Sequence, residues 1–133
     1  MKHLLLGLAC NESTSDVELN ISNNNLGALG AGVMENALPG VTCVSRLDVS
    51  ENNLDVELAS VVNGVARNKS LLSLNISKNL PKIKARDVVH VMEAIVQLIQ
   101  VCFVLEKNVY NDLTIASLLS IYESPLQADY CLQ

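Results

Sequence analysis

Aromatic residues are scarce in this chain of 133 residues: they make up 3% of it, and tryptophan is absent. Half of the residues are apolar, so leucine, valine, isoleucine and alanine carry most of the apolar mass and favour regular, repetitive packing. Positive charge is scarce as well: the chain has nine Lys and Arg residues and 14 Asp and Glu residues, which gives a net charge of −5. This balance argues against nucleic-acid binding, which needs a basic surface. The high apolar content excludes an intrinsically disordered chain.

The cysteines do not form a metal-site pattern. Their spacings are long and uneven, there is no CxxC pair, and His3 and His90 are far from any cysteine in sequence. The sequence therefore predicts no metal site and no cofactor. The number of cysteines leaves a disulfide framework open, but a chain of this length can build a core without one, which favours reduced thiols. The cysteines are Cys10, Cys43, Cys102 and Cys131.

Catalytic motifs are missing too. There is no G-x-S-x-G, no H-E-x-x-H and no glycine-rich phosphate loop. Gly27, Gly30 and Gly32 spell G-x-x-G-x-G, which is not the dinucleotide-binding order, so we interpret them as glycines of helix packing at a turn. Asp55 and Glu57 are interpreted as charges at the start of a helix rather than as an acid/base pair. The sequence predicts a protein that is not an enzyme.

The first ten residues allow two interpretations. Lys2 followed by the apolar stretch 4–9 resembles the start of a secretory signal, but six apolar residues are fewer than such a signal usually has. The second interpretation, which we prefer, is the end of a helix that turns Leu4, Leu5 and Leu8 inward. Elsewhere the richest apolar stretch, 88–105, is interrupted by polar residues, so no membrane span is predicted.

Three segments of the chain repeat one pattern. They read ELNISNNNL from Glu18, RLDVSENNL from Arg46 and SLNISKNLP from Ser73. The first leucines, Leu19, Leu47 and Leu74, are 28 and 27 residues apart. Leucine-rich repeats have periods of about 20–29 residues and a similar core pattern. The third segment departs from the pattern in one place, because a proline stands where the last leucine is expected.

The repeated pattern predicts short parallel strands. Each first leucine is followed two positions later by Ile or Val, so both side chains point to one face of a strand. The intervening residues would then form the concave surface, where a protein partner would bind: Glu18, Asn20, Ser22, Arg46, Asp48, Ser50, Ser73, Asn75 and Ser77. The asparagines of the pattern, Asn24, Asn52 and Asn79, are predicted to form a structural ladder, since a buried amide must bond the backbone of neighbouring repeats.

A helix is predicted after each strand. In the second repeat Leu58, Val61, Val62 and Val65 form one apolar helix face, with Asp55 as the expected N-cap and Arg67 and Lys69 near the C-terminal end. The first helix is expected to end at Leu38. The third is expected from about Arg86, with an apolar stripe of Val88, Met92, Ile95, Ile99 and Cys102.

These elements predict an α/β fold, a leucine-rich-repeat solenoid shaped as a horseshoe arc. Short parallel strands line its inside and helices its outside. Residues 1–100 form the repeat segment, with a partial leading repeat at 1–16 and repeats from about 17, 45 and 72. Residues 101–133 form an irregular or helical extension in which the pattern stops. Neither end resembles the polar cap of a solenoid, so we expect the chain to be part of a longer protein or an altered product of one.

The repeat segment resembles the leucine-rich-repeat domain of the CARMIL family, the cytoplasmic regulators of actin capping protein. The resemblance covers roughly residues 5–100 and is most specific in three stretches: the lead-in LLGLA from Leu5, the strand LDVSENNL from Leu47, and the turn NKSL from Asn68. It departs from the family over 101–122, before an SPLQ stretch resumes it at Ser124. An insertion or retained non-coding sequence would explain that interruption.

The resemblance implies a non-enzymatic interaction scaffold that serves actin filament assembly, with the capping-protein machinery as partner. It implies a cytoplasmic, cytoskeleton-associated location, at the plasma membrane or lamellipodium for the parent protein. The family's capping-protein-binding tail and its lipid-binding domain have no counterpart in this chain. The alternative is a leucine-rich-repeat fragment of a ribonuclease-inhibitor-like or innate-immune sensor protein, and a secreted binder is its weaker variant.

Overall fold

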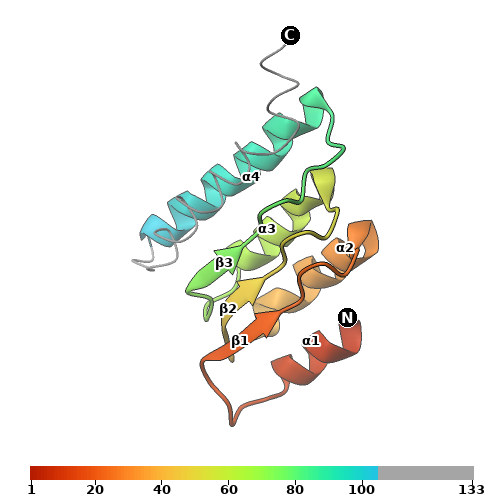
Figure 1. Ribbon diagram of the computed structural model, residues 1–133. Helices are drawn as coiled ribbons and strands as arrows, with labels where there is room; N and C mark the ends of the chain where they lie inside the picture. The colour runs from red at the N-terminus through yellow and green to blue at the C-terminus, as the bar shows by residue number, and fades with distance from the viewer. Residues whose placement is uncertain (105–133) are drawn as a thin grey trace.

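The computed structural model describes residues 1–104, with side chains to residue 100. This part is an α/β structure of alternating strands and helices (Figure 1). The strands are β1 (Val17–Asn20), β2 (Val44–Asp48) and β3 (Ser73–Asn75). The helices are α1 (Lys2–Ala9), α2 (Gly27–Ala37), α3 (Leu58–Ala66) and α4 (Ala85–Val104), with short 3-10 turns η1 (Leu38–Gly40) and η2 (Asp55–Glu57).

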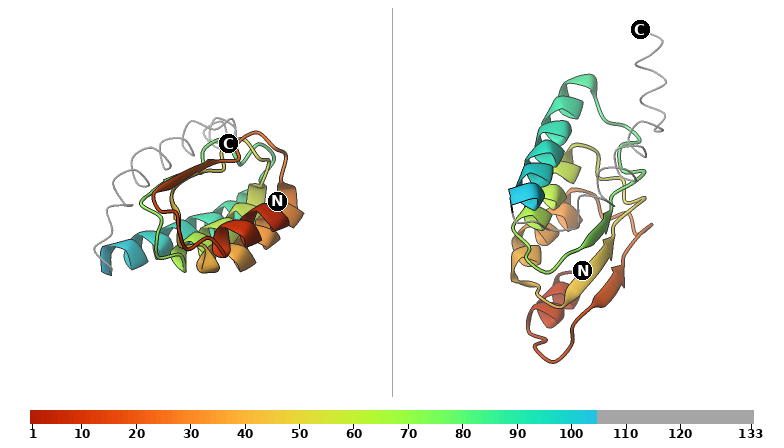
Figure 2. Two further views of the ribbon diagram at one scale, coloured as in Figure 1. Left: turned by 90° about the horizontal axis from the view of Figure 1, so that it is seen from below. Right: turned by 90° about the vertical axis from the view of Figure 1, so that its left-hand side faces the viewer.

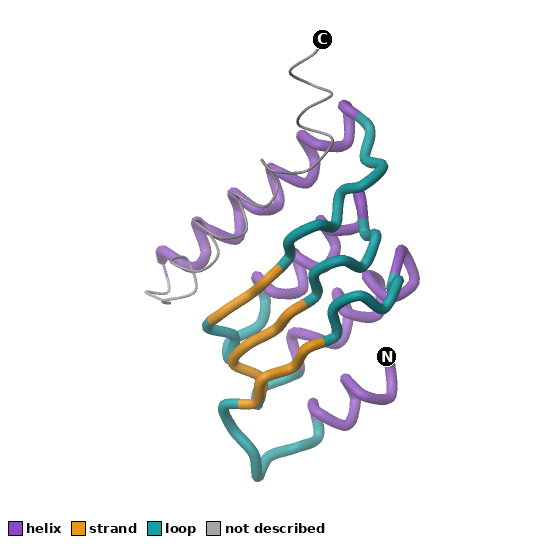
Figure 3. The backbone as a smooth tube through the Cα atoms, viewed as in Figure 1, coloured by secondary structure: helices purple, strands orange, loops and turns teal. Residues whose placement is uncertain are grey.

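The three strands form one parallel sheet in the order β1-β2-β3. Leu19 pairs with Leu47, and Leu47 pairs with Leu74. The three first leucines of the repeated segments therefore lie on adjacent strands, which confirms the predicted parallel arrangement. Figure 3 shows the three strands side by side, each followed by a similar loop. A strand, its turn and the helix after it are called a unit below: unit 1 contains β1 and α2, unit 2 contains β2 and α3, and unit 3 contains β3 and α4.

The strands and the helices form two layers, as the left view of Figure 2 shows. The helices pack in chain order, α1 on α2, α2 on α3 and α3 on α4. The core lies between the layers and contains aliphatic side chains from both, among them Leu47, Val49, Leu58, Val62 and Ile76, each at most 2% exposed. Burial of such side chains drives the layers together, since each contributes about 1.5–3 kcal/mol.

Helix α3 has the predicted apolar face, and its predicted N-cap is wrong. Leu58, Val61, Val62 and Val65 are all buried. Asp55 lies three residues before the helix, in η2, and α3 has no side-chain cap. The Asp55 Oδ1 instead accepts a hydrogen bond of 2.9 Å from the Lys82 backbone N–H in unit 3. The carboxylate thus joins two units, because the next unit brings a donor within its reach.

A close approach of α2 and α3 depends on a glycine that the sequence did not single out. A Cβ on Gly64 would lie 2.9 Å from the Glu35 Cα and 3.1 Å from the Met34 carbonyl oxygen. Gly32, one of the three glycines interpreted as packing residues, has nothing within 4 Å of such a Cβ. The packing interpretation is therefore wrong for Gly32, and the helix contact lies at Gly64.

Helices α1 and α4 lie where the sequence predicted helices, but each buries a different face from the one predicted. In α1, Leu5 is fully buried and Leu8 half-buried, but Leu4 is 45% exposed and does not face inward as expected. In α4, the most buried side chains are Val91, Ile95 and Leu98, so the stripe is rotated from the one predicted. The side chain of Cys102 and the predicted extension beyond residue 104 lie outside the described residues.

Candidate functional site

Each strand ends in the same polar turn. The side-chain Oδ1 of Asn20, of Asp48 and of Asn75 accepts two hydrogen bonds from the serine two residues later, one from its backbone N–H and one from its hydroxyl. The hydroxyl bonds are 2.6, 2.6 and 2.8 Å long. Such local bonds hold the strand end in a turn and orient the Asn or Asp side chain.

The polar residues of the strands form two rows across the sheet. One row is Glu18, Arg46 and Ser73, and the other is Asn20, Asp48 and Asn75, as the strand register requires. Together they line a hollow of about 160 Å³. We call these six residues the sheet surface.

The serines of the turns contribute less to this surface than the sequence suggested. Ser50 is only 7% exposed, and Ser22 and Ser77 are half-buried. Their hydroxyls are already bonded to the preceding Asn or Asp. Ser50 is the most buried because a neighbouring unit lies on each side of it.

The sheet surface carries charges of both signs at its centre. Arg46 lies on the middle strand, next to Glu18 on β1 and two residues before Asp48. Within residues 1–104 the only ion pair joins Lys78 and Glu51, 3.6 Å apart and largely exposed. The guanidinium of Arg46 is therefore not held by a carboxylate of the described chain, so it can meet an acidic group of a partner.

The asparagines of the repeated pattern link successive units. The Asn24 backbone N–H donates to Asn52 Oδ1 at 2.9 Å, and the Asn52 N–H donates to Asn79 Oδ1 at 2.8 Å. In return the Nδ2 groups of Asn52 and Asn79 reach the carbonyl oxygens of Ile21 and Val49 in the preceding units, both at 3.0 Å. Asn52 and Asn79 are buried, whereas Asn24, at the open end of the row, is exposed.

Asn68 is a structural asparagine outside this row, which the sequence reasoning missed. It is 1% exposed, and its Nδ2 donates to the carbonyl oxygens of Leu38 and Val41 at 2.7 Å each. Its Oδ1 accepts the backbone N–H groups of Ser70 and Leu71. The NKSL turn carried the signal, since a serine two residues after an asparagine marks an Asx turn elsewhere in this chain. We expect this buried amide to be inaccessible to modification in the folded protein.

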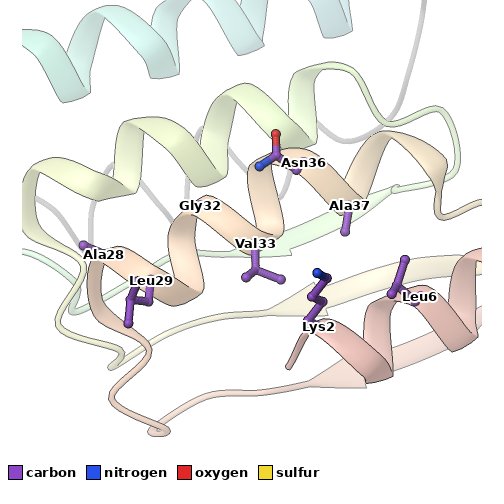
Figure 4. Close-up of a pocket in the computed structure, with 8 residues that line it drawn as sticks. All are labelled: Lys2, Leu6, Ala28, Leu29, Gly32, Val33, Asn36 and Ala37. Carbon is purple, nitrogen blue, oxygen red and sulfur yellow. The ribbon is translucent and has the colours of Figure 1, made fainter.

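A second hollow lies between helices α1 and α2, away from the sheet surface. It has a volume of about 500 Å³, and Lys2 and Leu6 line it from α1. Figure 4 shows Leu29 and Val33 of α2 on its other side. Leu29 is 88% exposed. The hollow is open and mostly apolar. No sequence pattern predicts it, because it depends on how the two helices cross.

Residues 1–104 contain neither a cluster of metal ligands nor a helix suited to cross a membrane. No three His, Cys, Asp or Glu side chains in this range come together as the ligands of a metal ion. None of the helices described here combines the length and the apolar character that a membrane crossing requires.

Several known proteins are similar to this chain over most of its length. The chain is 38% identical over 100 residues to human "Capping protein, Arp2/3 and myosin-I linker protein 3", and 37% identical to the rat protein of that name. These matches cover 75% of the chain and 7% of each relative. "Protein CARMIL" of Dictyostelium discoideum is 29% identical over 131 residues, which is 97% of the chain and 12% of that protein. No model of a protein family matches the chain.

Proposed function

Because the chain belongs to the CARMIL family, we propose that it is a non-enzymatic protein-interaction scaffold, a segment of a leucine-rich-repeat solenoid in a regulator of actin capping protein and of actin filament assembly. The single observation that carries this proposal is the 38% identity to a protein whose name states that it links capping protein, Arp2/3 and myosin-I. The chain spans 7% of that relative's length, so the activity of the whole relative is part of the proposal.

The arrangement of the units supports a scaffold. Three strands in parallel register, each followed by a helix and joined by asparagine amides, are what a solenoid of leucine-rich repeats requires. Solenoids commonly bind partners through the face that the strands line, and here that face is the sheet surface. We propose a cytoplasmic, cytoskeleton-associated location, with the plasma membrane or the lamellipodium as the place of action of the parent protein.

Arg46 is the residue on which we expect partner binding to depend most. It lies at the centre of the sheet surface, and no ion pair within the described residues occupies its guanidinium. Charged groups at the centre of an interface often contribute about 2 kcal/mol or more. The affinity of the Arg46→Glu variant for its partner should therefore be lower by about thirtyfold or more.

The test uses the purified chain with capping protein, Arp2/3 complex and a myosin-I tail, each titrated separately. Arg86→Glu is the matched control, because it makes the same charge change at an exposed position at the start of α4. We expect at least one of the three to bind and only Arg46→Glu to weaken it. Equal loss in both variants would show a general charge effect and refute the sheet surface as the binding site. Absence of binding to all three would refute the partner assignment for this segment.

A further inference from the structure

Asn63 and Gly64 form the only Asn–Gly pair in the 133 residues of the chain. Asparagine is a chemically labile residue. It is most labile before a glycine, because glycine has no side chain to shield its backbone nitrogen and its backbone is the most mobile. That nitrogen can then attack the side-chain carbon of the asparagine. The pair is therefore the place at which we expect an unfolded form of this chain to react first.

The packing of the helices fixes the glycine of this pair but not the asparagine. A Cβ at position 64 would lie 2.9 Å from the Cα of Glu35 on α2, so a side chain there would push the two helices apart. Asn63 lies half-buried on α3, and in the part of the chain that the structure describes no hydrogen bond holds its side-chain amide. The close approach of α2 and α3 thus keeps a glycine after Asn63, whose amide is free to react.

Helix α3 protects the pair while it is folded. In an α-helix each backbone N–H is bonded to the carbonyl oxygen four residues earlier, and ψ is about −42°. The Gly64 nitrogen is engaged in this way, and it cannot close a ring with the Asn63 side chain unless ψ changes. Helix α3 also packs on α2 and on α4, between which it lies in Figure 1, and most of its residues are buried. Reaction at Asn63 therefore requires that α3 opens first.

We propose that Asn63 is a deamidation site that reacts when α3 opens, and that its isoaspartate product prevents the helix from re-forming. In the opened chain the Gly64 nitrogen loses its proton to hydroxide and bonds to Cγ of Asn63. The Cγ–Nδ2 bond breaks, and the nitrogen leaves as ammonia after taking a proton from water. Water then opens the succinimide ring: cleavage at Cγ gives aspartate, and cleavage at the backbone carbonyl carbon gives isoaspartate. The net reaction consumes one water, releases one ammonia and needs no other reactant.

Isoaspartate changes the backbone of α3. The chain then runs through the side-chain carbons of residue 63, which adds one carbon atom to the backbone between Val62 and Gly64. The helical hydrogen bonds on the two sides of this point can no longer keep one register. Gly64 then no longer meets Glu35, and Val65 cannot keep its buried position. Because refolding does not reverse the reaction, a chain in which α3 has opened and reacted loses the contact between units 1 and 2 permanently, whether or not a partner binds the sheet surface.

Mass spectrometry measures the reaction. The full chain is incubated at mildly alkaline pH, in buffer and in concentrated guanidinium chloride, and trypsin then releases a peptide of residues 47–67. Fragmentation of this peptide separates conversion at Asn63 from conversion at Asn52 and Asn53. In denaturant Asn63 should react about tenfold or more faster than Asn52 and Asn53, and its rate in buffer should be lower by about tenfold or more. Equal rates at the three residues in denaturant, or an equal rate at Asn63 in buffer and in denaturant, would overturn the proposal.

A matched pair of leucine substitutions tests whether opening of α3 limits the rate. Leu58 is fully buried in α3, whereas Leu29 in α2 is 88% exposed. Leu58→Ala removes packing from α3 and should raise the rate at Asn63 in buffer by about tenfold or more, while Leu29→Ala should change it by less than about twofold. Both variants should react like the unsubstituted chain in denaturant. Equal rates of the two variants in buffer, or a difference that persists in denaturant, would contradict the requirement for opening.

The Asn63→Asp variant separates the effect of the new charge from that of the altered backbone. It carries the carboxylate of the aspartate product on a normal backbone, so its melting temperature should lie within about 2 °C of that of the unsubstituted chain. The isoaspartate form, made in denaturant, purified by chromatography and returned to buffer, should melt about 5 °C lower or more, or show no cooperative transition. A melting temperature equal to that of Asn63→Asp would refute the loss of α3.

Discussion

Replacing Asn52 with alanine is expected to lower the free energy of unfolding by about 2–4 kcal/mol. The Asn52 side chain is fully buried and makes four hydrogen bonds, one through Oδ1 and three through Nδ2. Each carbonyl oxygen that loses the Nδ2 group keeps a second donor. The cost therefore comes from four lost bonds and the cavity left behind, and only the Asn24 N–H, at the exposed end, loses its sole partner.

Urea unfolding followed by circular dichroism measures this change. The control is Asn36→Ala, which removes an exposed amide from the last turn of α2 and should change stability by no more than about 0.5 kcal/mol. A loss below about 1 kcal/mol for Asn52→Ala would contradict a structural role of the amide row.

The second large effect is expected at Gly64, where Gly64→Ala should destabilise the protein by about 1–3 kcal/mol. The new Cβ would lie within 3.1 Å of backbone atoms of Glu35 and Met34, and backbone atoms cannot move aside as a flexible side chain would. Alanine is a better helix former than glycine by about 1 kcal/mol, so the measured loss is what remains after this gain.

Gly32→Ala is the matched substitution. It lies in α2, has free space around the new Cβ, and should stabilise the protein by about 0.5–1 kcal/mol. Thermal unfolding of the two variants should therefore shift the melting temperature in opposite directions. A rise for Gly64→Ala would mean that α2 and α3 do not approach as closely as described.

The parallel strands could be predicted from the sequence because their signals are local and repeated. A leucine, a β-branched residue, a serine and an asparagine at constant spacing recur in three segments, so one register satisfies all of them at once. The apolar face of α3 could be predicted for the same reason, since its period of about 3.6 residues lies within a single segment.

The features that the sequence predicted wrongly or missed depend mainly on contacts between units. Asp55 has the position of an N-cap in its own segment, but Lys82 of the next unit supplies the donor that its carboxylate uses. Leu4 belongs to an apolar run, yet its side chain is 45% exposed. The closeness of Gly64 to Glu35 depends on how two helices cross, and glycine has no side chain that could signal this in a sequence pattern.

The asparagine contacts between successive units influence how such a protein can change in evolution. The contact from Asn24 to Asn52 and that from Asn52 to Asn79 have the same chemistry, and the residues they join are 28 and 27 positions apart. Duplication of one whole stretch of this length would create a new contact between units, in which the backbone N–H and the asparagine Oδ1 are already complementary. An insertion of a few residues into a strand would instead place an aliphatic side chain where an amide is needed. Gene segments that encode one unit of 27 or 28 residues are thus the natural step by which this architecture grows or shrinks.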